Sequence, residues 1–265
     1  MSPQDKDDRY NIRVLDRAIS VLSVLSDGRP RTLGELSEEV ALNNSTTFRL
    51  LSNLASHNYV ERDSQTSKYT LGIACLELAR SYQASNTLRR ASLTELQALR
   101  DETGETIHLA VLDHMEVVYL EKLHGLHAIG LMSSHVGGRA LAYCTGLGKA
   151  LLAFLEPEEV REAFKNTTFK RFTNTTIVEL DQLMVELETI RQQGYAFDRG
   201  EHEMDVRCVA MPIFGADGRV TAAISIAGPA NRMEPLETDH ERIDGMLRTA
   251  AVISARLGYR PLQNE

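Results

Sequence analysis

Residues 32–57 constrain the fold more than any other stretch, because they read as two short helices separated by a polar turn. Thr32 and Glu35 have the spacing of a capping box, in which hydroxyl and carboxylate each accept a backbone N–H at the start of a helix. Apolar residues follow at helical spacing. Residues 42–44, Leu-Asn-Asn, interrupt that pattern with residue types that favour turns and N-caps. A second helix is therefore predicted at about 45–57.

The predicted second helix has one apolar face and one polar face. Its apolar positions are Phe48, Leu51, Leu54 and Ala55, and its polar positions are Thr46, Arg49, Asn53 and Ser56. Arg pairs with guanine, Asn pairs with adenine, and small hydroxyls reach phosphates or thymine edges. The pattern predicts a helix-turn-helix whose second helix enters the DNA major groove. An ordinary amphipathic hairpin with a solvated face is the alternative.

A predicted β-hairpin follows the second helix directly. Residues 59–62 and 68–71 read as short strands, and the Asp-Ser-Gln-Thr-Ser run between them is typical of a turn. Such a hairpin is the wing of a winged helix-turn-helix, and it places Arg62 and Lys68 to contact the DNA backbone. The residues expected to contact DNA are Asn44, Ser45, Thr46, Thr47, Arg49, Asn53, Arg62 and Lys68.

The charge distribution does not by itself favour nucleic acid. The net charge is −8, and basic and acidic residues nearly balance within the first 85 positions. Between Leu42 and Asn58, however, the only formal charge is Arg49. We therefore expect affinity to depend on dimerisation and base contacts rather than on a strong basic field.

Length and composition indicate a two-domain globular protein. The 265 residues suffice for two cores, and no apolar run is long enough to span a bilayer. The first eleven residues lack the apolar core of a signal peptide, so the expected location is cytoplasmic. The three cysteines show no paired spacing, so no disulfide framework, metal site or cofactor is expected.

The second half of the chain reads as an α+β domain. A helix at 87–103 precedes it, either as a core helix or as a dimerising linker, and we favour the linker because the composition changes there. Helices are predicted at 149–155, 158–164, 176–193 and 236–257. Thr176 and Glu179 have the spacing of a capping box at the start of the third. Strands are predicted at 107–112, 117–123, 128–132, 195–198, 207–214 and 220–227, and a flexible loop at 133–139.

The ordered set of motifs resembles the IclR family of bacterial transcriptional regulators over nearly the whole chain. The resemblance rests on the winged-helix start, GRALAYCTGLGKALLAFL (138–155), GYAFDRGEHEMDVRCVAMPIF (194–214) and AAISIAG (222–228). It implies an N-terminal all-α winged helix-turn-helix and a C-terminal α+β GAF-like effector domain, joined by a linker helix and assembled as homodimers or homotetramers. The expected segments are a disordered lead at 1–11, a DNA-binding domain at 12–84, a linker helix at 85–104, and an effector-binding and oligomerisation domain at 105–265.

An effector site is expected where glycines open a helix. The N–H groups of Gly146 and Leu147 at that N-terminus favour a carboxylate, and glycine lets a ligand approach the backbone. The family resemblance adds Asp198, Cys208, Ser225 and Ala227, the last at a position where many relatives have serine. The full expected set is Met132, Arg139, Tyr143, Gly146, Leu147, Asp198, Cys208, Ser225 and Ala227.

The expected function is that of a sequence-specific transcriptional regulator, more often a repressor, whose operator binding responds to a small organic acid. Residues 105–123 resemble members of the family that answer to sugar acids. A hydrolase using Cys208, a histidine and Asp198 is one alternative, although Cys208 lies within a predicted strand rather than on an exposed turn. A winged-helix module that binds a protein partner is another.

Overall fold

The computed structural model describes residues 12–126 and 132–260, and it divides into two compact units between Ser85 and Asn86. The expected disordered lead at 1–11 lies outside the described residues. So does the expected strand at 128–132, except for Met132. No helix within the described ranges has the length and apolar character needed to cross a bilayer.

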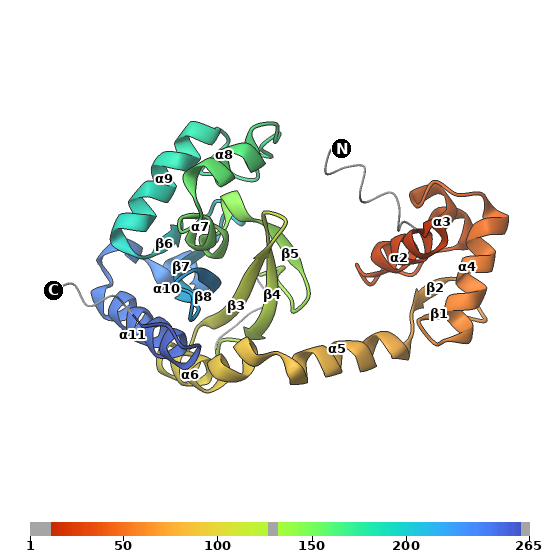
Figure 1. Ribbon diagram of the computed structural model, residues 1–265, viewed down its shortest axis with the longest axis horizontal. Coiled ribbons are helices and arrows are strands. Elements are labelled where there is room, and N and C mark those ends of the chain that lie inside the picture. Colours follow the sequence, from red (N-terminus) through yellow and green to blue (C-terminus); the bar gives the residue numbers. More distant parts are fainter. Residues whose placement is uncertain (1–11, 127–131, 261–265) are drawn as a thin grey trace. The chain divides into compact units, whose positions relative to one another are not determined.

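The first unit is a winged helix-turn-helix (Figure 1). Its core joins buried side chains of the helices to the hairpin, among them Leu25, Leu36, Leu51 and Val60. Its elements are α2 (Arg13–Leu25), α3 (Leu33–Glu39), α4 (Asn44–Ser56), β1 (Val60–Arg62), β2 (Tyr69–Leu71) and α5 (Ile73–Ser85).

Local hydrogen bonds explain where these elements begin. The predicted capping box is present, since the Thr32 hydroxyl accepts from Glu35 N and the Glu35 carboxylate accepts from Thr32 N at 2.7 Å. Asn43 caps α4 by accepting from Thr46 N at 2.8 Å. Asp63 closes the wing turn by accepting two backbone N–H groups.

The second unit is built on a six-stranded antiparallel sheet in the order β5-β4-β3-β8-β7-β6. The strands are β3 (Thr106–Asp113), β4 (Glu116–Leu123), β5 (Arg139–Leu141), β6 (Ala196–Asp198), β7 (Val206–Phe214) and β8 (Val220–Pro229). The longer helices are α6 (Thr87–Thr103), α7 (Gly146–Leu152), α8 (Pro157–Phe164), α9 (Leu180–Gln193) and α11 (His240–Arg256).

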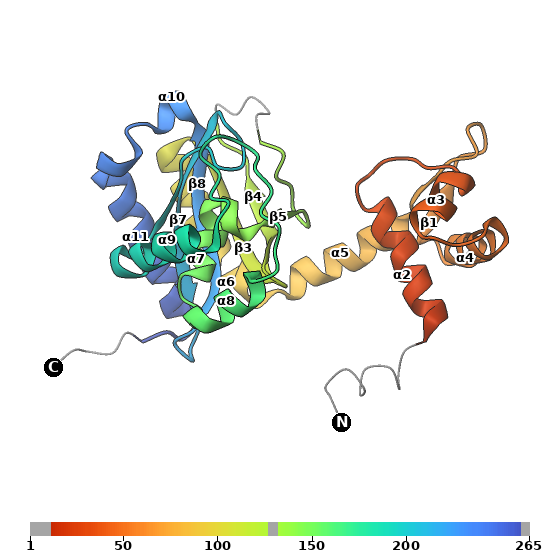
Figure 2. The ribbon, with the colours of Figure 1, turned by 90° about the horizontal axis from the view of Figure 1, so that it is seen from above.

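Helices cover both faces of this sheet (Figure 2). On one face, α6 and α11 contribute Leu96, Leu99, Ile243 and Met246 to a core with alternate strand residues. On the other face, α7, α8 and α9 form a second core. The helix expected as a linker is thus α6, and two of its leucines are buried in the second unit. None of the residues of α5 is buried.

Several sequence-based boundaries in the second unit differ from the structure. The helix expected from Thr176 begins at Leu180, because the Thr176 hydroxyl instead donates to the carbonyl of Glu201 at 2.7 Å. The loop expected through Arg139 ends one residue earlier, where β5 begins. The closing helix is interrupted, with a 3₁₀ turn (Leu236–Thr238) before α11.

Candidate nucleic-acid interface and ligand pocket

The second helix of the helix-turn-helix, α4, has a clear inner and outer side. Thr47, Leu50 and Leu51 are buried against the core. With about 100° of rotation per residue, the opposite direction carries Ser45, Arg49, Ser52 and Ser56, all exposed. No acidic residue occurs in α4. This outer side offers hydroxyls and a guanidinium to a groove lined with bases and phosphates.

Two residues of α4 were assigned to the wrong side by sequence. Thr47, expected to contact DNA, is fully buried, and its hydroxyl donates to the carbonyl of Asn43 at 3.2 Å. Its side chain therefore cannot reach DNA. Phe48, expected in the core, is 49% exposed. A threonine whose hydroxyl bonds one turn back satisfies its polar group locally, so it can replace an aromatic in the core.

The other expected DNA contacts are accessible. Asn44 and Asn53 are exposed, and Thr46 is half-buried beside the cap. On the wing, Arg62 is exposed, with its guanidinium 5.7 Å from the centre of the Tyr69 ring, and Lys68 is half-buried. Ser52 lies at the centre of the outer side but was missing from the sequence-based set. Its position becomes clear only once the structure shows that Thr47, and not Phe48, faces the core.

A pocket of about 80 Å³ opens on the α7 side of the sheet in the second unit. It is lined by every expected effector residue except Tyr143. The sequence missed several further lining residues: His108, Tyr119, Ser133, Ser134, His135, Thr145, His202, Glu203 and Val206. These come from separate strands and loops, so no sequence spacing marks them as a group.

Glycines at the start of α7 allow the helix to lie close to the sheet. The Thr145 hydroxyl accepts from Gly148 N at 3.2 Å, which caps the helix. A Cβ on Gly146 would lie 2.6 Å from the Cys208 sulfur, and a Cβ on Gly148 would lie 2.2 Å from the Ala142 carbonyl oxygen. Glycine is therefore required at both positions by packing.

Acceptors and neutral groups dominate the buried wall of the pocket. Asp198 accepts from the N–H groups of Gly200 and Glu201, at 3.0 and 2.8 Å, while burial raises the pKa of its carboxyl. His108 contacts the hydroxyls of Ser134 and Ser225, at 2.9 and 3.3 Å. Burial lowers the pKa of His108 to about 3, so its ring is neutral.

The thiol of Cys208 is not set up as a nucleophile. It lies on β7 facing the pocket, and burial raises its pKa, with the Asp198 carboxylate adding to the effect. Nucleophilic cysteines need the opposite shift, toward thiolate. The hydrolase alternative therefore has no support from this site.

Cations near the pocket are already paired. Arg139 contacts the Asp113 carboxylate at 2.7 Å and also pairs with Glu116, so its guanidinium is occupied rather than free for a ligand. Lys122 donates to the backbone carbonyls of Met132 and Ser134. Any anionic ligand must therefore be met largely by neutral donors.

Tyr143 was wrongly placed in the pocket. Its hydroxyl donates to the Lys170 carbonyl at 2.9 Å, and accepts from Lys170 N at 2.8 Å. Its ring packs edge-on against Phe169 and Phe164. Tyr143 thus holds the segment after α8 against the core.

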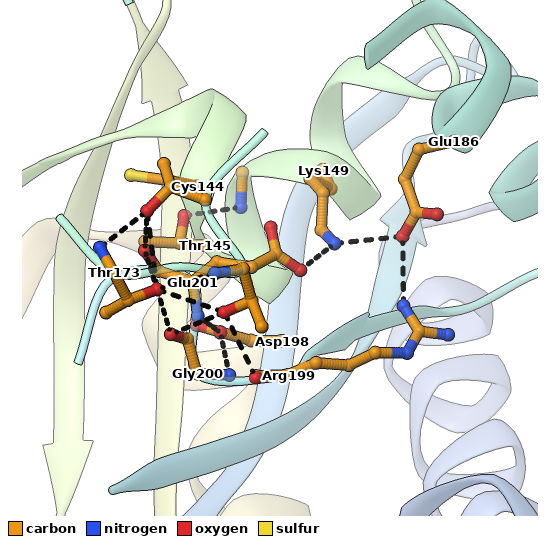
Figure 3. A network of polar contacts seen from close by, with 12 residues as sticks. Cys144, Thr145, Lys149, Thr173, Glu186, Asp198, Arg199, Gly200 and Glu201 are labelled. Carbon is orange, nitrogen blue, oxygen red and sulfur yellow. Dashed lines mark hydrogen bonds and ion pairs between the residues drawn. The ribbon is translucent and has the colours of Figure 1, made fainter. Parts of the chain in front are cut away.

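A polar network lies behind the pocket (Figure 3). Lys149, on α7, is fully buried and donates to Glu186 and Glu201. Thr173 and Thr176 donate to backbone carbonyls at positions 200 and 201. The network fixes the loop after β6, whose next residues, His202 and Glu203, line the pocket.

A winged helix-turn-helix followed by an α+β unit with a small cavity lined by polar and apolar groups defines a class of protein, the DNA-binding regulators that carry their own ligand-binding domain. Comparisons with known proteins agree. The model of the IclR helix-turn-helix domain matches residues 14–64, and that of the bacterial transcriptional regulator IclR C-terminal domain matches residues 80–255.

Individual relatives span most of the chain. The HTH-type transcriptional regulator KdgR of Dickeya chrysanthemi is 36% identical over 92% of this chain and 79% of its own length. The HTH-type transcriptional repressor AllR of Salmonella paratyphi A is 34% identical over 94% of this chain and 91% of its own. The crystal structure of an IclR homologue from Microbacterium hydrocarbonoxydans complexed with 4-hydroxybenzoate matches with a TM-score of 0.79 at 26% identity, over 92% of this chain and 98% of that one.

The chain therefore belongs to the IclR family of bacterial transcriptional regulators. It is a DNA-binding transcriptional regulator and not an enzyme.

Proposed function

We propose that this protein is a cytoplasmic repressor whose operator binding is modulated by a small organic acid held in the pocket of the second unit. The observation that carries the proposal is the pocket itself, where residues from β3, β7, β8 and the start of α7 converge. Support for a ligand comes from the homologue complexed with 4-hydroxybenzoate, and support for repression comes from the relative named a repressor.

The chemistry of the pocket favours an acid that also carries hydroxyl groups. The N–H groups of Gly146 and Leu147 and the hydroxyl of Ser225 are donors suited to a carboxylate. Asp198 and Glu203 are acceptors suited to ligand hydroxyls. A sugar acid matches both requirements, whereas a purely apolar ligand would use neither these donors nor these acceptors.

We further propose that the protein is at least a homodimer, in which residues 12–84 read DNA and residues 85–104 connect them to the effector domain at 105–265. The support is apolar surface in the first unit. Exposed large apolar side chains gather on α2, at its N-cap and on α5: Ile12, Val14, Leu15, Ile19, Ile73, Leu76, Leu78 and Tyr82. A Leu76→Glu variant is expected to sediment as a smaller species than the wild type.

A mobility-shift titration on the DNA flanking its own gene tests the main proposal. Wild type, Arg49→Ala and Asn53→Ala are compared at one salt concentration, each with and without a panel of organic and sugar acids. We expect specific binding that one acid weakens, and binding about tenfold weaker for Arg49→Ala. If the protein binds specifically but no acid changes its affinity, the pocket does not bind an acid effector. If both variants bind as tightly as wild type, Arg49 and Asn53 of α4 do not contact the operator.

A further inference from the structure

Phe48 is unusual among the exposed apolar residues of the first unit. Within its described residues, the other large apolar side chains exposed there lie on α2, just before it, or on α5, and Phe48 alone lies on α4. It is 49% exposed and is not among the residues that pack against the core of that unit. A single exposed aromatic ring is common on a protein surface, but an apolar group of a partner that covered it would stabilise the complex.

The position of Phe48 on the helix identifies that partner. The outer side of α4 centres on Ser45, Arg49 and Ser52, and at about 100° per residue Phe48 and Asn53 flank it on opposite sides. When a recognition helix lies in the major groove, residues toward its N-terminal end contact base edges, and Phe48 lies in the first half of α4. The base edge that presents an apolar group there is thymine, through its 5-methyl.

We propose that Phe48 is a specificity-determining residue that contacts a thymine methyl group in the operator. Arg49, next to it, presents five donors suited to guanine or phosphate, and α4 carries no acidic side chain that would repel the DNA. The ring adds a preference for thymine that hydrogen bonds do not supply, because it contacts the methyl group. Hydrogen bonds can distinguish thymine from cytosine only by the acceptor or donor at this edge.

A thymine-to-uracil scan tests this directly, since uracil lacks only the methyl. Full-length protein selects duplexes from a random library, and each thymine of the selected site is then replaced in turn by uracil at constant salt. We expect uracil at one position in each half-site to weaken wild-type binding about fourfold, the effect of one buried methyl. Phe48→Ala is expected to bind the thymine duplex correspondingly more weakly and to be indifferent to uracil there.

Two variants and a stability measurement act as controls. Phe48→Leu, which keeps an apolar group, is expected to retain part of the discrimination. Ser52→Ala, on the outer side of α4, is expected to weaken binding to the thymine and uracil duplexes by the same factor, so that their ratio stays that of the wild type. An unchanged melting temperature of Phe48→Ala shows that the fold is intact. If wild type and Phe48→Ala lose the same factor at every uracil, the proposal is wrong on its own. If the wild type selects no sequence from the library, this proposal and the proposed role of α4 in reading DNA are both wrong.

Discussion

Nζ of Lys149 lies 2.5 Å from Oε1 of Glu201, across 52 positions of sequence, in a site where both side chains are buried. The contact joins the helix that opens with Gly146 and Leu147 to the loop that carries His202 and Glu203, and all four residues line the pocket. A buried ion pair therefore holds two walls of the ligand site together (Figure 3).

Replacing Glu201 by Gln is expected to remove a pH dependence of stability. Burial raises the pKa of Glu201 from 4.5 to about 7, against the opposing pull of Lys149. Between these values the native state binds more protons than the unfolded state, so this group lowers stability as pH rises from 4.5 to 7. Urea unfolding of both proteins across that window should show Glu201→Gln gaining stability relative to wild type with rising pH.

Glu186→Gln is the matched control for that experiment. Burial alone would raise the pKa of Glu186, but Lys149 and Arg199 lower it below its ordinary value. Its favourable contribution is therefore complete above pH 4.5 and is lost only as pH falls further. Because the Glu186 charge adds only slightly to the raised pKa of Glu201, the stability difference between Glu186→Gln and wild type should change much less with pH than that of Glu201→Gln. Parallel pH profiles for the two variants would contradict the role given to Glu201.

Replacing Lys149 by Met is expected to destabilise the protein by about 3–5 kcal/mol, because Glu201 and Glu186 would lose their buried cation. The measurement is the free energy of unfolding in urea. Lys165→Met removes an exposed pair with Glu162 and should change that value by less than about 0.5 kcal/mol. Equal effects of the two substitutions would show that the buried pair has no special role.

Among polar pocket residues, Ser225 should affect ligand binding more than Arg139. Ser225→Ala removes a donor from the buried wall and is expected to weaken acid binding about threefold to tenfold. Arg139→Ala should change it by less than about twofold, since Asp113 and Glu116 already occupy the guanidinium. Calorimetric titration with the acid found in the mobility-shift panel measures both. A larger loss for Arg139→Ala would mean that the ion pairs open for the ligand.

Gly148→Ala is expected to destabilise the protein by about 2 kcal/mol, because its Cβ would lie 2.2 Å from a backbone oxygen. Gly34→Ala is the control, in a helix where a Cβ meets nothing within 4 Å. That change should stabilise the protein by up to about 1 kcal/mol, because alanine lowers the conformational entropy of the unfolded chain. Melting temperatures that move in the same direction would contradict the packing argument.

Local sequence accounts for the start of α3 and α4, the two helices of the helix-turn-helix. The capping box at Thr32 and the cap at Asn43 depend on hydrogen bonds between residues three positions apart. They can therefore be predicted from the local sequence. The same reasoning failed at Thr176, where spacing alone matched a capping box. There the hydroxyl bonds to a carbonyl 25 residues away, which no local pattern reveals.

By itself, the sequence determined the winged helix-turn-helix, the alternation of strands and helices in the second half, and, through family resemblance, part of the pocket lining. The tertiary structure alone decided which side of α4 is buried, which cations are already paired, and where Lys149 finds its carboxylates. The reason is physical. Caps and periodicity depend on neighbours within one or two turns, whereas burial and ion pairing depend on groups that only the folded chain brings together.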